Sequence, residues 1–145
     1  YSHPQYGGDA HPMKRPLRAK SGGQSLVEFA LLLPVLAMIT FLLLDLGRGV
    51  YYYSVVYNAV REGARYGIVH PTDGSGVEAA VRNLTVGLDQ ADLTVDYWMP
   101  FPVTTGSTLW VEATYRFRPV TPLADLFIPS GFIDLYNKST MYIEK

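Results

Sequence analysis

The hydrophobic positions of this chain form one long run, followed by shorter segments in which apolar and polar residues alternate. Residues 26–46 are apolar at every position except Glu28, Pro34, Thr40 and Asp45. A helix of about 20 residues, rising about 1.5 Å per residue, spans the roughly 30 Å hydrocarbon core of a bilayer. Buried helices of soluble proteins are seldom apolar on all sides, and a secretory signal has a shorter apolar region. We therefore predict a retained transmembrane helix over residues 24–46.

The helical pattern continues past this run. No proline occurs between residues 52 and 69, and small or apolar side chains recur every three or four residues along one side. Ala59, Gly63 and Gly67 form the narrowest part of that side, where another backbone can approach closely. Because glycine inside a helix costs about 1 kcal/mol relative to alanine, two glycines at this spacing indicate a packing role. We expect the partner to be the chain's own sheet or, less often, another subunit.

The rest of the chain predicts a short helix and three strands. Loop-forming residues at 70–76 end the long helix, and residues 77–86 have one apolar face at helical spacing. Residues 92–98, 108–117 and 133–144 are predicted to be strands, from alternating apolar and polar positions in the first two. The predicted fold class is α+β: a long N-terminal transmembrane helix that continues into a small extracytoplasmic domain with a short second helix and a three-stranded antiparallel sheet.

The charge distribution predicts an orientation for this helix. The basic residues of 1–23 outnumber the acidic ones by three (4 − 1): they are Lys14, Arg15, Arg18 and Lys20, against Asp9. Basic residues just before a membrane helix favour a cytoplasmic N-terminus. We therefore divide the chain into a basic cytoplasmic leader (1–23), the transmembrane helix (24–46) and an extracytoplasmic domain (47–145). This organisation is that of a single-pass protein of the cytoplasmic membrane.

Residues just beyond the predicted span have side chains typical of a membrane–water interface. They are Arg48, Tyr51, Tyr52 and Tyr53. An arginine can extend its charged end toward the headgroups, and tyrosines concentrate at this level. The alternative is that the three adjacent tyrosines face protein on several sides of the helix.

The composition excludes several classes of function. The formal net charge is −1, whereas nucleic-acid-binding proteins are normally basic. The chain has no cysteine, which removes disulfides and thiolate metal sites, and its three histidines lack ligand spacing. No Ser/His/Asp set and no glycine-rich phosphate loop is visible in the sequence. We therefore predict a protein without enzymatic activity, catalytic residues, metal or cofactor.

Three motifs carry a resemblance to a known family. Residues 22–29 read Gly-Gly-Gln-Ser-Leu-Val-Glu-Phe, so that Glu28 is the fifth residue after Gly23. A carboxylate inside a membrane helix costs about 2.5–3.5 kcal/mol on insertion scales, which indicates a function. Residues 58–67 read Asn-Ala-Val-Arg-Glu-Gly-Ala-Arg-Tyr-Gly, and 119–123 read Pro-Val-Thr-Pro-Leu. With these motifs the chain resembles the TadE-like family, minor pseudopilins of the tight-adherence pilus system with a type IV pilin-like N-terminal helix.

The resemblance implies a structural, membrane-anchored subunit of a surface pilus or filament. It implies cleavage between Gly23 and Gln24 by a prepilin peptidase, followed by assembly with other pilin-like subunits. Glu28 is then the expected assembly residue. Three interpretations of Glu28 stay open: it pairs with the new amino group of Gln24 in its own or a neighbouring subunit, it only guides peptidase recognition and assembly, or it lies in the headgroup region without a role.

A second function is compatible with the same sequence. In this alternative the chain is an unprocessed, single-pass accessory subunit of a larger membrane complex, and residues 1–23 contact partners on the cytoplasmic side. Both functions require membrane lipid as a partner, and neither involves nucleic acid. The state of Gly23 distinguishes the two.

Overall fold

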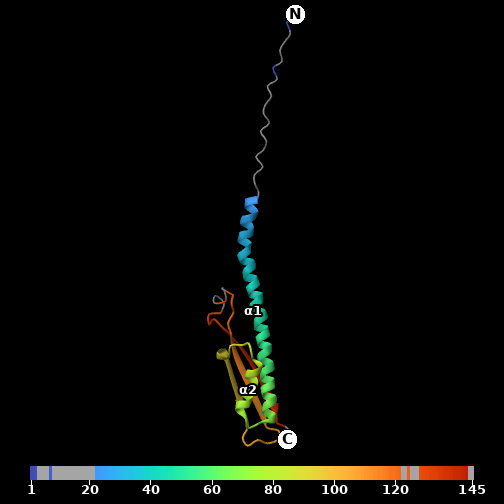
Figure 1. Ribbon diagram of the computed structural model, residues 1–145, viewed down its shortest axis with the longest axis vertical. Coiled ribbons are helices and arrows are strands. Elements are labelled where there is room, and N and C mark those ends of the chain that lie inside the picture. Colours follow the sequence, from blue (N-terminus) through green and yellow to red (C-terminus); the bar gives the residue numbers. More distant parts are fainter. Residues whose placement is uncertain (3–6, 8–21, 122–123, 125–127, 144–145) are drawn as a thin grey trace. The chain divides into compact units, whose positions relative to one another are not determined.

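The computed structural model describes residues 1–2, 7, 22–121, 124 and 128–143. Its elements, labelled in Figure 1 where there is room, are α1 (Gly22–Val69), α2 (Gly74–Leu84), the 3-10 helix η1 (Gln90–Asp92), β1 (Leu93–Trp98), β2 (Thr108–Phe117) and β3 (Ile133–Tyr142). The chain divides into two compact units, Tyr1–Pro34 and Val35–Lys145, each of which is described by itself. The elements and the antiparallel pairing of the strands confirm the predicted α+β class.

In the unit Tyr1–Pro34, the secondary structure that is described is the first part of α1. The large apolar side chains of this part are exposed, as Leu31 is at 71%. Pro34 lies inside α1, which the structure shows as one continuous helix. By length and composition, α1 is able to cross a membrane.

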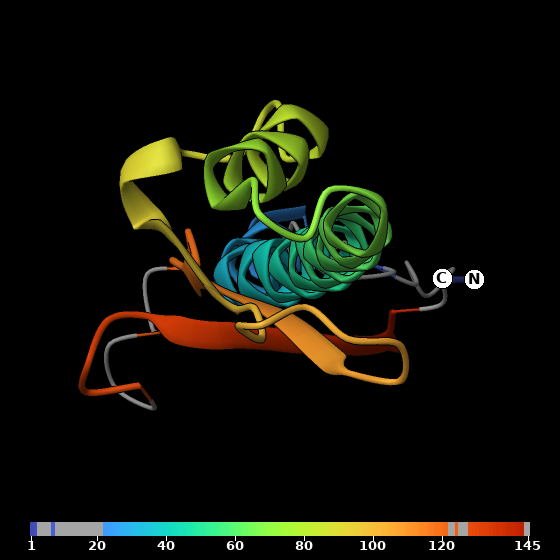
Figure 2. The ribbon, with the colours of Figure 1, turned by 90° about the horizontal axis from the view of Figure 1, so that it is seen from below.

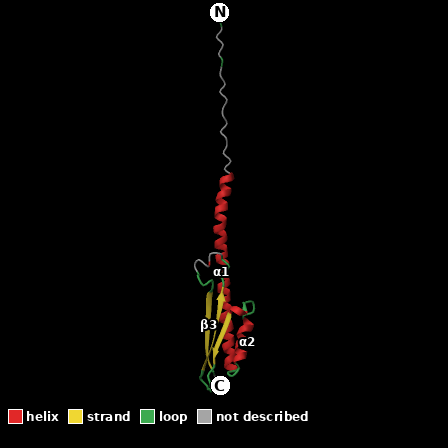
Figure 3. Ribbon diagram, turned by 90° about the vertical axis from the view of Figure 1, so that its left-hand side faces the viewer, coloured by secondary structure: helices red, strands yellow, loops and turns green. Residues whose placement is uncertain are grey.

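In the unit Val35–Lys145, three antiparallel strands pair in the order β1-β2-β3. The central strand β2 pairs with both of its neighbours. In this register Tyr115 lies opposite Leu93 of β1 on one side and Leu135 of β3 on the other. Helices α1 and α2 lie on the same face of this sheet (Figure 2). Figure 3 shows the strands running alongside the later part of α1. The unit therefore has two layers, helices on one side and the sheet on the other.

The hydrophobic core lies between these two layers. The buried residues of β2 alternate along its whole length: Leu109, Val111, Ala113, Tyr115 and Phe117. The helices cover them with buried residues of α1 (Val56, Ala59, Val60 and Ala64) and of α2 (Val77 and Val81). Both the bounds of β2 and its buried face agree with the prediction from the sequence.

The second helix begins at Gly74, earlier than the predicted residue 77. Asp73 is its N-cap, and the side chain accepts a hydrogen bond of 2.9 Å from the backbone N–H of Gly76. This bond satisfies one of the free amides of the first helical turn, so the predicted loop residues 74–76 are helical. The helix ends at Leu84, because Thr85 caps it with its own backbone N–H, which donates to the carbonyl of Arg82.

The bounds of the outer strands also differ slightly from the prediction. Strand β1 begins at Leu93, because η1 takes the residues up to Asp92. Strand β3 ends at Tyr142, and the predicted end at residue 144 lies outside the described residues. The division into leader, membrane span and extracytoplasmic domain stays a prediction.

Candidate functional site

Asp45 is a buried carboxylate in an otherwise exposed apolar stretch of α1. It is 6% exposed, whereas its neighbours Leu44 and Leu46 are 58% and 64% exposed. Burial without hydrogen-bond donors would be costly for an ionised carboxyl group. We therefore describe the hydrogen-bond donors that surround the Asp45 carboxylate.

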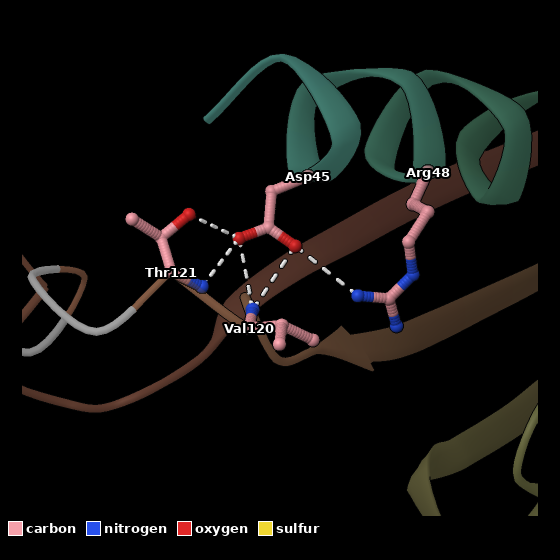
Figure 4. A network of polar contacts seen from close by, with 4 residues as sticks. All are labelled: Asp45, Arg48, Val120 and Thr121. Carbon is pink, nitrogen blue, oxygen red and sulfur yellow. Dashed lines mark hydrogen bonds and ion pairs between the residues drawn. The ribbon is translucent and has the colours of Figure 1, made fainter. Parts of the chain in front are cut away.

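Two elements far apart in sequence meet at this carboxylate (Figure 4). The backbone N–H of Val120 donates to both carboxylate oxygens, at 3.0 and 2.8 Å, and the backbone N–H of Thr121 donates to Oδ2 at 2.7 Å. The Thr121 hydroxyl donates to Oδ2 at 2.5 Å, and Arg48 Nη1 donates to Oδ1 at 3.1 Å. We call these four residues the Asp45 clasp. It holds the segment that follows β2 against α1.

The local sequence explains why the clasp forms where it does. Strand β2 ends at Phe117, and Pro119 has no backbone N–H with which to continue a ladder. The next two residues then present their N–H groups side by side to one carboxylate. Hydrogen bonds to a charged acceptor contribute about 1.5–3 kcal/mol each, so the clasp offsets the desolvation of Asp45.

Arg48 belongs to both the clasp and an aromatic cluster. Its guanidinium carbon lies 5.7 Å from the ring centroid of Tyr52 and 5.4 Å from that of Phe117. Tyr52 itself packs edge-on against Phe117 and Tyr115, at 5.8 and 5.5 Å between centroids. At these distances the cation and the rings attract each other. The charge of Arg48 is therefore held in place from two sides.

The four residues predicted for a membrane interface have two different surroundings. Arg48 and Tyr52 contact the sheet, as described above, while Tyr51 and Tyr53 are exposed at 62% and 48%. Tyr51 also packs against Tyr52, with 5.7 Å between ring centroids. Their location at a membrane surface stays a prediction.

The small-residue ridge of α1 faces the core. Ala59 is fully buried, and a Cβ at Gly63 would lie 2.5 Å from Val81 Cγ2 of α2 and 3.5 Å from Val111 Cγ1 of β2. A Cβ at Gly67 would lie 3.3 Å from Leu109 Cδ2 and from Val77 Cγ2. The ridge thus packs closely against side chains of both α2 and β2 within the unit Val35–Lys145.

The residues of the predicted processing site lie at the start of α1. Gly23 is exposed, and a Cβ there would meet nothing within 4 Å. The side-chain amide of Gln24 donates to Glu28 Oε1 at 3.2 Å, one helical turn away. Glu28 is exposed and has this amide as a neighbour in the uncut chain. Cleavage and assembly roles for these residues stay predictions.

Two carboxylates, Asp92 of η1 and Glu112 of β2, are engaged in ion pairs. Asp92 pairs with Arg118 at 2.8 Å, and Glu112 pairs with Lys138 at 3.4 Å. In the described part of the chain, no three His, Cys, Asp or Glu residues come together as a metal site would require.

The Asp45 clasp was not predicted from the sequence. Two signals were present: an aspartate near the end of an apolar run, and the Pro-Val-Thr segment after the strand. Neither signal alone shows that the two segments meet, because 75 residues separate Asp45 from Val120. Pairing them requires the antiparallel course of β2 beside α1.

Comparison with known proteins gives one match. The family model described as TadE-like protein matches residues 23–65, which contain the predicted processing site, Glu28, the clasp residues of α1 and part of the ridge. No curated protein and no solved structure matches the chain. The family suggests a pilus-associated, pilin-like subunit with a structural rather than enzymatic role. The resemblance to the TadE-like family, predicted from sequence motifs, is thereby confirmed over residues 23–65.

Proposed function

We propose that this chain is a membrane-anchored, pilin-like subunit that assembles into a surface pilus or filament. One observation carries the proposal: the apolar side chains of α1 are exposed in its first part and buried in its later part. Between residues 26 and 44 the large apolar side chains of α1 are exposed, whereas Val56, Ala59, Val60 and Ala64 are buried in the core. Soluble proteins rarely expose so large an apolar surface. A bilayer, and later the helices of neighbouring subunits, would cover it.

The charge pattern supports an orientation for this anchor. The net charge of +3 on residues 1–23 favours the cytoplasm for that segment, which leaves the sheet and α2 outside. The partners in this proposal are membrane lipid, other pilin-like subunits and a prepilin peptidase. No nucleic acid is involved.

The start of α1 supports a role for processing. In the uncut chain, Glu28 accepts from the neutral side-chain amide of Gln24. Cleavage after Gly23 would give Gln24 an ammonium group, and a charged donor bonds a carboxylate about twice as strongly as a neutral one. The proposed peptidase cut therefore creates the partner that Glu28 requires for assembly, in its own subunit or in a neighbour.

Intact mass measurement and N-terminal sequencing test this proposal on protein taken from its native membrane or from shed filaments. We expect a chain that begins at Gln24. A Gly23→Leu variant should retain residues 1–23, and Gly22→Ala serves as the control, since it changes the adjacent glycine only. A native chain that retains residues 1–23 would contradict the pilin-like proposal and favour an unprocessed accessory subunit of a larger membrane complex.

A further inference from the structure

Gln24 becomes the first residue of the chain if the proposed cleavage takes place, and a glutamine at that position is chemically reactive. Its own amino group can attack the side-chain carbonyl carbon Cδ and close a five-membered ring. The bond between the amino nitrogen and Cδ forms, the bond between Cδ and Nε2 breaks, and Nε2 leaves as ammonia with a proton from the amine. The product is pyroglutamate, a neutral lactam. Because the nucleophile and the carbonyl belong to one residue, no second reactant is required.

This ring closure would remove the group on which the proposed assembly depends. Cleavage after Gly23 supplies an ammonium group at Gln24 as the partner of Glu28. A lactam N–H has no charge, and a neutral donor bonds a carboxylate about half as strongly as a charged one. The processed chain therefore requires Gln24 to stay open if Glu28 is to have a charged partner.

In the structure, the nitrogen that would leave is held by a hydrogen bond. Nε2 of Gln24 donates to Glu28 Oε1 at 3.2 Å, and both residues are exposed. The two residues are four positions apart, so they are neighbours on one face of α1. The hydrogen bond draws the amide toward the next turn of the helix, whereas ring closure requires the side chain to bend back onto its own amino group. Ring closure therefore has to break this hydrogen bond.

The Glu28 carboxylate also acts on the attacking nitrogen. An amine attacks a carbonyl only in its neutral form, because an ammonium group has no free electron pair. A carboxylate nearby favours the ammonium form. A carboxylate can instead accept a proton from an attacking amine and so accelerate the reaction. The observed contact is with the leaving nitrogen of Gln24, which favours protection over acceleration.

We propose that Glu28 protects the processed N-terminus, because it holds the side-chain amide of Gln24 away from ring closure. The inference rests on the proposed cleavage after Gly23 and adds a second role for Glu28. In this role Glu28 is a positioning residue that preserves its own partner for assembly. Gln24 is then a site of pyroglutamate formation wherever its contact with Glu28 is lost.

The test measures ring closure by intact mass, which falls by the mass of one ammonia molecule. It uses the full chain in detergent, with residues 20–23 exchanged for the recognition sequence of a site-specific protease that cuts directly before Gln24. This cut exposes Gln24 without the prepilin peptidase. The fraction of chains that have lost ammonia is then followed over time at about pH 8, where a substantial share of α-amino groups is neutral.

We expect Glu28→Ala to close the ring about five-fold faster than the natural chain, the effect of losing one exposed hydrogen bond. Alanine is the best helix former, so this variant keeps the start of α1 helical. Glu28→Gln retains an acceptor oxygen without the charge, and its rate should lie between the two. Val27→Ala changes the adjacent residue only and is the control. Equal rates in the natural chain and Glu28→Ala, or a faster rate in the natural chain, would overturn the proposal.

The pH dependence separates the hydrogen bond from the ion pair. At about pH 9.5 most α-amino groups are neutral, since their usual pKa is about 8. The carboxylate then protects mainly through the side-chain amide of Gln24, so the natural chain should still react more slowly than Glu28→Ala. A difference that disappears at this pH would assign the protection to charge alone and overturn the role of the amide contact.

Protein from the native membrane distinguishes this inference from the proposed function. A native chain that retains residues 1–23 would contradict the proposed cleavage, while the rates measured after the protease cut would still test Glu28. A native chain that begins with pyroglutamate at position 24 would support the cleavage and overturn the protection. Intact mass decides between these results, because N-terminal sequencing does not read a chain that begins with pyroglutamate. We expect a chain that begins at Gln24 with its amide intact.

Discussion

At the scale of single residues, the two carboxylates of the apolar run have opposite surroundings. Asp45 is buried and accepts hydrogen bonds from Arg48, Val120 and Thr121, whereas Glu28 is exposed and accepts one bond from Gln24. The donors of Asp45 come from α1 and from the segment that follows β2, so Asp45 fastens that segment to the helix. Glu28 retains acceptor capacity for a partner, which is consistent with the proposed role in assembly.

Replacing Asp45 by asparagine should release the segment after β2. Asparagine has one acceptor oxygen, and its NH₂ group would face N–H donors that need an acceptor. We expect the free energy of unfolding of the unit Val35–Lys145 to fall by about 3 kcal/mol. Hydrogen exchange at the amides of Val120 and Thr121 should accelerate in the full chain in detergent. Asp96→Asn, at an exposed strand position, is the control, and an equal change in both variants would contradict a specific role of the clasp.

Asp73 should make the stability of the fold depend on acid pH. The pKa of Asp73 is lowered, first by the backbone N–H of Gly76 and then by the hydroxyl groups of Tyr66 and Ser75. A carboxyl group with a lower pKa in the folded state stabilises the fold above its unfolded pKa of about 3.9. This contribution is lost as the pH falls through the lowered pKa.

Asparagine is also a good N-cap but does not titrate, so Asp73→Asn tests this pH dependence. Urea unfolding of the full chain in detergent, followed by circular dichroism at several pH values from about 2 to 6, gives the measurement. The variant should lose less stability than the natural chain as the pH falls. Parallel curves for the two proteins would show that Asp73 contributes nothing to acid sensitivity.

At the scale of elements, the hydrophobic periodicity of the sequence predicted the buried face of β2. It did not predict the start of α2, which depends on a single capping side chain. The alternation of β2 identified its buried face, because a strand has only two faces and one of them must cover the core. The start of α2 was missed because the cap depends on the direction of the Asp73 side chain. Tyr51, Tyr52 and Tyr53 are the same type of residue, yet Tyr52 packs against Phe117 and Tyr53 is exposed. Their surroundings differ because successive positions on a helix point about 100° apart.

The ridge of α1 should respond to small substitutions in a graded way. At Gly63 an added methyl would lie 2.5 Å from Val81 Cγ2, and valine has few alternative rotamers in a helix. Overpacking costs about 1–3 kcal/mol, which exceeds the gain of about 1 kcal/mol in helix propensity, so Gly63→Ala should destabilise the fold. Gly67→Ala should be close to neutral. Its nearest neighbours, Leu109 Cδ2 and Val77 Cγ2, would lie at 3.3 Å, so they need to shift by only a few tenths of an ångström, and the gain in helix propensity offsets that cost.

Gly47→Ala completes this series, because a Cβ there would meet nothing within 4 Å. It should raise stability by up to about 1 kcal/mol through helix propensity alone. Denaturant titrations of the three variants under one detergent condition rank them. An order in which Gly63→Ala is the most stable would contradict close packing of the ridge.

At the scale of the whole molecule, the absence of cysteine makes the proposed orientation directly measurable. Single cysteines introduced by Ser2→Cys and Thr105→Cys report on the leader and on the loop before β2, since both natural residues are exposed. Four basic residues against one acid in 1–23 should hold that segment in the cytoplasm. A membrane-impermeant maleimide added to intact cells should therefore label Thr105→Cys and leave Ser2→Cys unlabelled in chains that keep residues 1–23.

Permeabilised cells provide the control, because both cysteines should then react. Replacing Lys14, Arg15, Arg18 and Lys20 together by glutamine removes the charge bias and should increase the share of chains with the opposite orientation. Such chains would place the sheet on the cytoplasmic side, where it could not join a surface filament. If Thr105→Cys reacts only after permeabilisation in the natural charge background, the proposed orientation is wrong.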